Sequence, residues 1–327
     1  MEKFFVVING ANEDSWSAWV WNDVTKRAQI YLDNNNLENK FLKKLKKWHF
    51  GNKLNKYFWI PFKQIWNRTL CIQMEQLNEK DSNYIIFQST IKFAPSYIAQ
   101  LKKRKNCKIV LYLPDTIGNL GIAKSRRAFQ RYCSYYKIDK VFSFDKKDCE
   151  LYDLEFFDIY STKKMEEDIK DTSDLFYVGS CRNQDRYTLL IRIFEKLKTR
   201  VDMNFYFVGV SDEQKKYSDS IKYNQFLKYE DVMKFTISSN CLLEIVNENQ
   251  EGNTLRFKEA VCYNKKLLTN NKNVVKSRYY DSKFIHVFSD VDNIDTKWLQ
   301  EKVDVDYNYC GDFSPSRLLD LIVSKCN

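Results

Sequence analysis

The chain has 327 residues, of which 44% are hydrophobic and 29% are charged, a composition that supports sizeable cores and argues against a wholly disordered chain. Only 8 glycines and 4 prolines argue against an all-β, turn-dense chain, and the length suggests about two domains. The net charge of +10 favours an anionic partner, such as a nucleic acid, an anionic membrane surface or a phosphorylated substrate, with a solvated basic surface as the alternative.

The amino-terminal stretch MEKFFVVINGANED has too few apolar residues for a signal peptide, and no run of about 18 apolar residues predicts a membrane span. The nine cysteines are scattered without a C-x-x-C pair, so they predict neither a disulfide framework nor a zinc site. We therefore expect a cytoplasmic protein with reduced thiols.

Short apolar runs alternate with helical patterns through the first half of the chain. This rhythm predicts a parallel sheet covered by helices on both faces, in a Rossmann-like domain over residues 1–160. The predicted strands are 4–10, 83–89, 108–115 and 140–145, and the predicted helices between them are 96–104 and 125–136.

Residues 40–74 form a basic aromatic segment without an acidic residue. Lysine and arginine pair with lipid phosphates while tryptophan and tyrosine settle at the headgroup level, so the segment predicts docking on a membrane surface. A packed lid with a basic rim and a groove for single-stranded nucleic acid are the alternatives. The basic and aromatic residues are Lys43, Lys44, Lys46, Lys47, Lys53, Lys56, Lys63, Arg68, Trp48, Phe50, Tyr57, Phe58, Trp59, Phe62 and Trp66.

A charged, apolar-poor stretch at residues 161–173 predicts a linker, after which the strand and helix rhythm restarts. Residues 174–312 are expected to form a second Rossmann-like domain, and residues 313–327 a final helix that begins near Ser314 and Pro315. The predicted strands here are 175–180, 204–210, 241–246, 265–269 and 284–290, with helices at 186–197 and 230–239.

The turn after the strand CLLEIV is a candidate binding site. Open parallel sheets bind ligands at the carboxyl ends of their strands, and Gly252 lets backbone approach a ligand closely. The helix that begins near Asn253 or Thr254 presents free N–H groups to an anion. The carboxylate of Glu259 would then suit the paired hydroxyls of a ribose; alternatively Glu259 simply pairs with Arg256, three residues earlier.

The stretch EGNTLRFKEAVCYNKKLLT resembles the E-x7-E segment of GT-B glycosyltransferases, with Glu251, Gly252, Glu259 and Ala260 at the matching spacing. The form Q-x-G-x-T-x-R-x-x-E is similar to bacterial transferases that assemble capsular and lipopolysaccharide sugars. This form is carried by Gln250, Gly252, Thr254, Arg256 and Glu259.

LFYVGSCRNQDRYTLLIRIFEKL resembles the opening of the nucleotide domain of that family, with Gly179 after a strand and Arg186 where a basic residue binds the diphosphate. Arg182 is a second candidate. The resemblance implies a donor site made by these residues together with Glu251, Gly252, Asn253, Thr254, Arg256 and Glu259, and it places residues 223–233 near the base.

The resemblance implies two Rossmann-like domains facing a cleft, with the last helix crossing back to the first domain. It implies a metal-independent hexosyltransferase that moves a sugar from a nucleotide donor, expected to be a UDP-sugar, to a lipid-linked saccharide in capsule, lipopolysaccharide or exopolysaccharide assembly. Such an enzyme would lie at the inner face of the cytoplasmic membrane, without a cofactor or nucleic acid. The alternatives are a non-enzymatic basic membrane- or nucleic-acid-binding module and an inactive transferase-like partner protein.

The catalytic base is not carried by a motif. Asp115, at the carboxyl end of KIVLYLPD, is the best placed carboxylate to take the acceptor's proton if the reaction inverts. Glu13 and Asp14 are alternatives, and each of the three residues could instead be a turn-forming acid. Two D-V-D triplets, at 290–292 and 304–306, are the kind that occurs by chance, and we expect no metal site because Arg186 and a helix N-terminus neutralise diphosphate.

Overall fold

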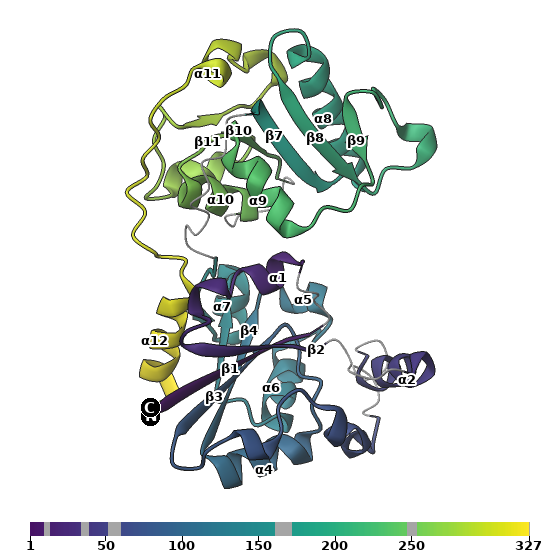
Figure 1. Cartoon of the computed structure of the whole chain (residues 1–327), viewed down its shortest axis with the longest axis vertical. Coiled ribbons are helices and arrows are strands. Elements are labelled where there is room, and N and C mark those ends of the chain that lie inside the picture. The colour runs from purple at the N-terminus through teal and green to yellow at the C-terminus, as the bar shows by residue number, and fades with distance from the viewer. Residues whose placement is uncertain (10–13, 34–38, 52–59, 161–171, 247–253, 327) are drawn as a thin grey trace. The chain divides into compact units, whose positions relative to one another are not determined.

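The structure, a computed structural model, describes residues 1–9, 14–33, 39–51, 60–160, 172–246 and 254–326. The chain divides into two compact units, one made of Met1–Thr162 with Gly311–Asn327 and the other of Lys163–Cys310. Each unit contains one six-stranded sheet with helices packed on it, and every strand pair is parallel (Figure 1). The predicted pair of parallel α/β halves is confirmed.

The first sheet has the strand order β2-β1-β3-β4-β5-β6. The middles of its central strands are apolar because both faces of the sheet are covered. On β4, Ile109 and Leu111 face the core that α4 and α6 close, whereas Tyr112 on the other face meets Trp21 edge to face. The strands are β1 Glu2–Asn9, β2 Ala28–Asp33, β3 Ser82–Gln88, β4 Cys107–Leu113, β5 Lys140–Ser143 and β6 Glu155–Phe156.

The final helix, α12, packs on the first unit, as the sequence predicts. Arg27 pairs with Asp320 of α12 at 2.6 Å, and Lys325 pairs with Glu155 at 3.0 Å. The helices of this unit are α1 Trp16–Trp19, α2 Lys40–Phe50, α4 Pro95–Lys105, α5 Ile117–Leu120, α6 Arg126–Tyr135, α7 Lys146–Tyr152 and α12 Pro315–Cys326, with 3₁₀ turns at Asn22–Val24, Lys63–Thr69 and Met74–Gln76.

The second sheet has the order β12-β11-β10-β7-β8-β9. Its strands are β7 Ser173–Ser180, β8 Met203–Val208, β9 Ile221–Tyr223, β10 Ser239–Glu244, β11 Lys266–Thr269 and β12 Ile285–Val287. Its helices are α8 Gln184–Leu197, α9 Tyr229–Ile237, α10 Leu255–Tyr263 and α11 Thr296–Gln300, with 3₁₀ turns at Asp212–Gln214, Lys272–Lys276 and Val291–Asn293.

Strand β7 begins at Ser173, the residue that the sequence analysis placed last in the linker. Ser173 pairs with Ser239 in the register of β7 and β10, and the two hydroxyl oxygens lie 2.9 Å apart. The backbone pairing of Ser173 therefore extends the sheet by one residue into the predicted linker. Among the described residues, no helix is both long and apolar enough to cross a membrane.

Candidate functional site

The candidate site lies at the carboxyl edge of the second sheet, where three neighbouring strands end. β7 ends at Ser180, β10 at Glu244 and β11 at Thr269, and the helices α8 and α10 begin after the first two of these strands. Parallel strands end at the same edge, so these residues and helix starts lie together. Four predicted site residues fall outside the described residues: Glu13, Glu251, Gly252 and Asn253.

A buried carboxylate holds the start of α10 against this edge. Thr254 caps the helix, because its hydroxyl accepts a hydrogen bond from the N–H of Phe257. The same hydroxyl donates to Glu244, and the hydroxyl of Thr269 donates to the second oxygen of Glu244 at 2.5 Å. Glu244 is 2% exposed. We call Glu244, Thr254 and Thr269 the Glu244 clamp; it fixes the predicted helix start to two strand ends.

Burial raises the pKa of Glu244, while the bonds from Thr254 and Thr269 act in the opposite direction. The folded protein therefore keeps this proton at pH values where the unfolded chain, with a carboxyl pKa near 4.5, has released it. The stability gained from this proton is present below that unfolded value and is lost as pH rises through the folded pKa.

We expect the unfolding free energy of the wild type relative to Glu244→Gln to fall as the pH rises above the unfolded carboxyl value of 4.5. Urea titrations at several pH values, followed through amide exchange of α10 peptides, measure this difference. Glu230→Gln changes an exposed glutamate of the same unit and serves as the control. A Glu244→Gln difference that does not change with pH would contradict the assignment.

Glu259 lies inside the protein with no exposed surface. The hydroxyl of Tyr229 donates to one of its oxygens at 2.5 Å, and Arg256 forms an ion pair with the other. Arg256 also donates to the hydroxyl of Thr236 and the carbonyl of Val178, each at 3.4 Å. Burial raises the pKa of Glu259 and the guanidinium lowers it. The structure thus contains the Arg256–Glu259 pair that the sequence analysis gave as the alternative to ribose binding.

Arg186 lies at the start of α8, beside the end of β7. Its backbone N–H donates to the side chain of Asn183, the helix cap, at 2.9 Å. Its guanidinium donates to the carbonyl of Ser180 at 3.2 Å. Since β7 and β10 are neighbours in the sheet, the starts of α8 and α10 follow adjacent strands. A guanidinium and the N-termini of two helices at one edge are suited to an anion.

Gly179 and Arg182 are in tightly packed surroundings. A Cβ on Gly179 would lie 2.7 Å from the hydroxyl oxygen of Tyr177, so a larger residue here would require the buried Tyr177 ring to move. The side chain of Arg182 packs on Gly209. A Cβ added to Gly209 would lie 2.6 Å from the Cγ of Arg182. Gly209 has a φ of +84°, and its N–H donates to the side chain of Asn224 at the end of β9. Arg182 is therefore packed against the turns that follow β8 and β9, at the same carboxyl edge of the sheet.

Two predicted catalytic carboxylates belong to the first unit. Asp115 follows β4 and accepts hydrogen bonds from the N–H of Thr116 at 2.8 Å and the amide of Asn119 at 3.0 Å, both on one oxygen. Asp14 is half-buried in the turn before α1. Asp115 thus forms the turn that was given as its alternative role, at the carboxyl end of β4.

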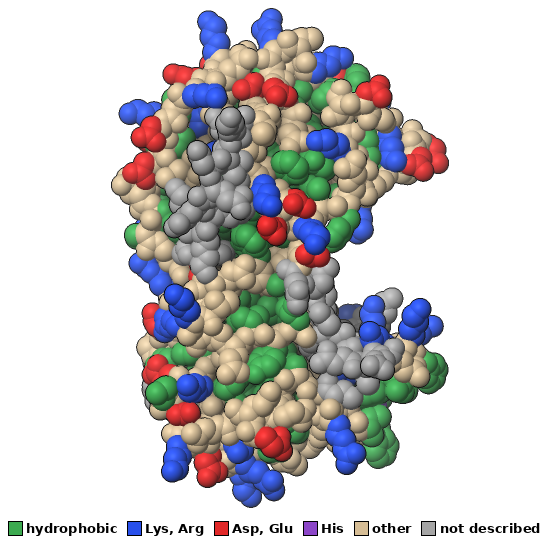
Figure 2. Space-filling model, viewed as in Figure 1, with side chains coloured by type: hydrophobic (Ala, Val, Ile, Leu, Met, Phe, Trp, Pro, Cys, Tyr) green, Lys and Arg blue, Asp and Glu red, His purple; other side chains and the backbone are tan. Residues whose placement is uncertain are grey.

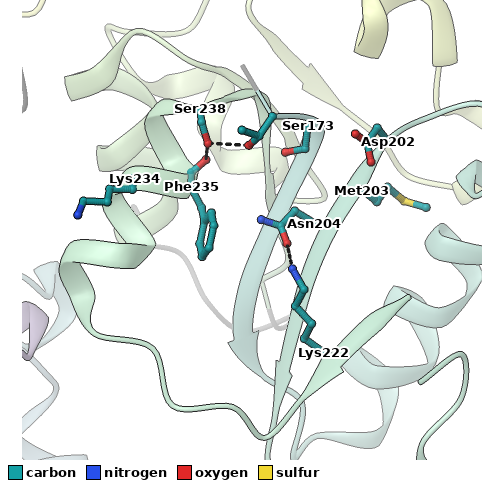
Figure 3. A pocket seen from close by; sticks show the side chains of 9 residues that line it. Ser173, Asp202, Met203, Asn204, Lys222, Lys234, Phe235 and Ser238 are labelled. Atoms are coloured by element: carbon teal, nitrogen blue, oxygen red, sulfur yellow. Dashed lines mark hydrogen bonds between the residues drawn. The ribbon is translucent and has the colours of Figure 1, made fainter. Parts of the chain in front are cut away.

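A cavity of about 460 Å³ lies at the opposite edge of the second sheet, at the starts of β7 and β8. Lys222 donates to Asn204 there at 2.8 Å (Figure 3). Ligands of open parallel sheets bind at the carboxyl edge, so we do not assign the donor to this cavity. Its lining residues are Thr172, Ser173, Asp202, Met203, Asn204, Lys222, Lys234, Phe235 and Ser238.

Within the described parts of the chain, no group of three or more His, Cys, Asp or Glu side chains is placed to hold a metal ion. In the first D-V-D triplet, Asp290 accepts a hydrogen bond from the N–H of Asp292, and Asp292 pairs with Lys196 at 3.6 Å. In the second triplet, Asp306 accepts from the N–H of Asn308. These three carboxylates therefore have structural partners within the second unit.

No family model matches the chain, and no curated protein matches it. An α-glucosyltransferase in complex with UDP-glucose and DNA containing an abasic site is 11% identical, with a TM-score of 0.52 over 99% of this chain and 100% of that one. An α-glucosyltransferase with UDP and a 13-mer DNA containing an HMU base is also 11% identical, with a TM-score of 0.51 over 98% and 100%.

A UDP-forming α,α-trehalose-phosphate synthase from Burkholderia vietnamiensis is 10% identical, with a TM-score of 0.48 over 100% of this chain and 96% of that one. At identities this low, the likeness of the two glucosyltransferases shows the fold alone. Two parallel α/β units and the carboxyl-terminal helix on the first unit define the GT-B fold class, which the sequence analysis predicted.

Proposed function

We propose that the protein is a GT-B glycosyltransferase that moves a sugar from a nucleoside diphosphate donor to a lipid-linked saccharide. One observation carries the donor half of this proposal: the starts of α8 and α10 follow adjacent strands, with Arg186 at the first and the Glu244 clamp at the second. Two helix N-termini and a guanidinium form a suitable environment for a pyrophosphate, which carries its charge on several closely spaced oxygens.

In this proposal Arg186 holds phosphate oxygens, Arg182 and Gly179 belong to the same binding site, and the start of α10 at Thr254 faces the diphosphate. We also assign Glu251, Gly252 and Asn253, which lie outside the described residues, to the donor site, and residues 223–233 to the surroundings of the base. Uracil is the base we favour, because UDP or UDP-glucose accompanies the similar glucosyltransferases. The guanidinium and the helix dipoles supply positive charge to the leaving diphosphate without a metal.

The ribose contact proposed for Glu259 requires a change at a fully buried side chain. Its carboxylate would have to exchange the hydroxyl of Tyr229, now 2.5 Å away, for a hydroxyl of the sugar. Arg256 would remain as the charge partner. An arrangement in which Glu259 and Arg256 only support the start of α10 is the alternative within the same function.

For the acceptor half, we propose a lipid-diphosphate saccharide of capsule, lipopolysaccharide or exopolysaccharide assembly, reached at the inner face of the cytoplasmic membrane. Asp115 is the proposed base, with Asp14 and Glu13 as alternatives. One oxygen of Asp115 already accepts two hydrogen bonds, so its other oxygen would take the proton of the acceptor hydroxyl.

The test is sugar transfer followed by mass spectrometry, with UDP-, GDP-, CDP- and dTDP-sugars and a lipid-diphosphate saccharide. We expect a product one sugar residue heavier with one donor class, and strongly reduced product for Arg186→Ala. Nucleotide binding without transfer to any acceptor would indicate an inactive transferase-like partner. Neither binding nor transfer would favour a non-enzymatic basic module.

A nucleic acid is the second candidate acceptor. The net charge of +10 favours a polyanion, and DNA is present in both complexes of the similar glucosyltransferases. The same assay with duplex and single-stranded DNA decides between the two candidate acceptors. Transfer of the sugar to DNA, with no transfer to the lipid-linked saccharide, would make DNA the acceptor.

A further inference from the structure

Helix α2 turns an apolar stripe to solvent. Phe41, Leu45 and Trp48 are spaced four and three residues apart, so they lie on one face of the helix, and Leu42 lies beside them. Their exposed fractions are 70%, 36%, 53% and 38% in the order Phe41, Leu45, Trp48 and Leu42. A helix of a globular domain normally buries such a stripe, so this one calls for a partner.

A row of lysines runs along one side of the stripe. Lys40, Lys44 and Lys47 each precede one of its residues by one position, and all three are exposed. Successive residues are about 100° apart around a helix of 3.6 residues per turn, so the two rows are parallel. The sequence of α2, KFLKKLKKWHF, contains no acidic residue. In Figure 2, hydrophobic and basic side chains lie together where Figure 1 shows α2.

The buried side of α2, next to the stripe, fixes this orientation. His49 and Phe50 are buried, and the indole N–H of Trp66 donates to Nδ1 of His49 at 3.0 Å. Because Nδ1 accepts, Nε2 carries the hydrogen that His49 donates to the carbonyl of Pro61 at 2.6 Å. Phe62, which follows Pro61, has a φ of 61° and is 68% exposed. Its aromatic ring therefore lies on the surface next to the residue that His49 contacts.

We propose that the α2 surface, made of Phe41, Leu42, Leu45 and Trp48 with Lys40, Lys44 and Lys47, docks the protein on an anionic membrane. The apolar stripe enters the boundary between headgroups and acyl chains, Trp48 lies at the headgroup level, and the lysine row pairs with lipid phosphates. Docking depends on the α2 side chains alone; its use in meeting a lipid-linked acceptor rests on the proposed function.

The chemistry of the surface favours a membrane over other occupants. A second copy of α2 would bring lysines against lysines with no acid on either helix. A single-stranded nucleic acid stacks its bases on aromatic rings, whereas Leu42 and Leu45 offer no ring on which a base can stack. An anionic bilayer uses both halves of the surface, since aliphatic side chains enter it and lysines meet its charge.

Vesicle flotation of the full chain, without donor or acceptor, tests the proposal. We expect binding to phosphatidylglycerol–phosphatidylcholine vesicles, and at least a tenfold lower partition coefficient for Phe41→Ser/Trp48→Ser. Lys44→Gln/Lys47→Gln should also lower it at least tenfold. The matched controls are Leu151→Ser, an exposed leucine on α7, and Lys103→Gln/Arg104→Gln, exposed residues on α4; these should bind as the wild type does.

Thermal midpoints equal to that of the wild type will show that the variants fold, as expected for exposed side chains. Wild-type affinity in both α2 double variants would overturn the proposal, as would no vesicle binding by the wild type. A dimer that Phe41→Ser/Trp48→Ser dissociates, with no vesicle binding, would assign the surface to a second copy. Binding to oligonucleotides but not to vesicles would assign it to nucleic acid. None of these outcomes would alter nucleotide binding, so the membrane proposal and the proposed function fail independently of each other.

Discussion

Replacing Glu259 by glutamine is expected to lower the free energy of unfolding of the second unit by about 3 kcal/mol. The change leaves the size of the side chain almost unaltered but removes the negative charge beside Arg256. Arg256 has only 11% of its side chain exposed, so its charge would remain in a poorly solvated place without its partner. A urea titration followed through amide exchange of α10 peptides measures the loss.

A double-mutant cycle with Arg256→Met separates the ion pair from other effects of the substitution. We expect Glu259→Gln/Arg256→Met to recover at least half of the stability lost in Glu259→Gln, because no buried charge is then left alone. Losses that simply add would contradict a stabilising pair. If Glu259→Gln instead kept full stability and lost nucleotide affinity, Glu259 would be assigned to the ribose.

Arg186→Ala is expected to weaken nucleoside diphosphate binding by about 30-fold, because a hydrogen bond between charged groups contributes roughly 1.5–3 kcal/mol. Isothermal titration calorimetry measures the affinity directly. Arg192→Ala is the matched control: Arg192 lies on the same helix, but its side chain is 55% exposed and pairs with Asp290 at 3.7 Å. Equal affinities in the two variants would remove the diphosphate role of Arg186.

The buried strands are the part of the fold that the sequence predicts best. The segments IVLYL in KIVLYLPD and LFYV in LFYVGS are apolar without a break because helices cover both faces of the sheets. The strands β2, β6 and β9, which are all edge strands, do not follow from the sequence pattern. β6 has two residues and β9 has three, which are too few to show a period.

For the site, local spacing predicts local contacts. The start of α10 at Thr254 and the Arg256–Glu259 pair follow from residues at most three positions apart. Glu244 was missed as a site residue, although an acid inside the apolar run CLLEIV is itself a signal. Its partner Thr269 lies 25 residues further along the chain, so only the sheet brings them together.

For the basic aromatic segment too, contacts between residues far apart in the chain could not be predicted. Its composition predicts a membrane surface, but composition does not indicate which face of α2 turns outward. That orientation depends on His49 and Trp66, which are 17 residues apart. Lys46 is buried in the same helix, so not every lysine of the segment belongs to the surface.

The central claim is that the carboxyl edge of the second sheet holds the diphosphate of a nucleotide donor. Calorimetric titration of the full chain with UDP, GDP, CDP and dTDP tests it most directly. We predict that one of these nucleotides, with UDP favoured, binds at one site per chain, and that Arg186→Ala weakens this binding while Arg192→Ala does not. Failure of all four nucleotides to bind, or binding that Arg186→Ala leaves unchanged, would contradict the claim.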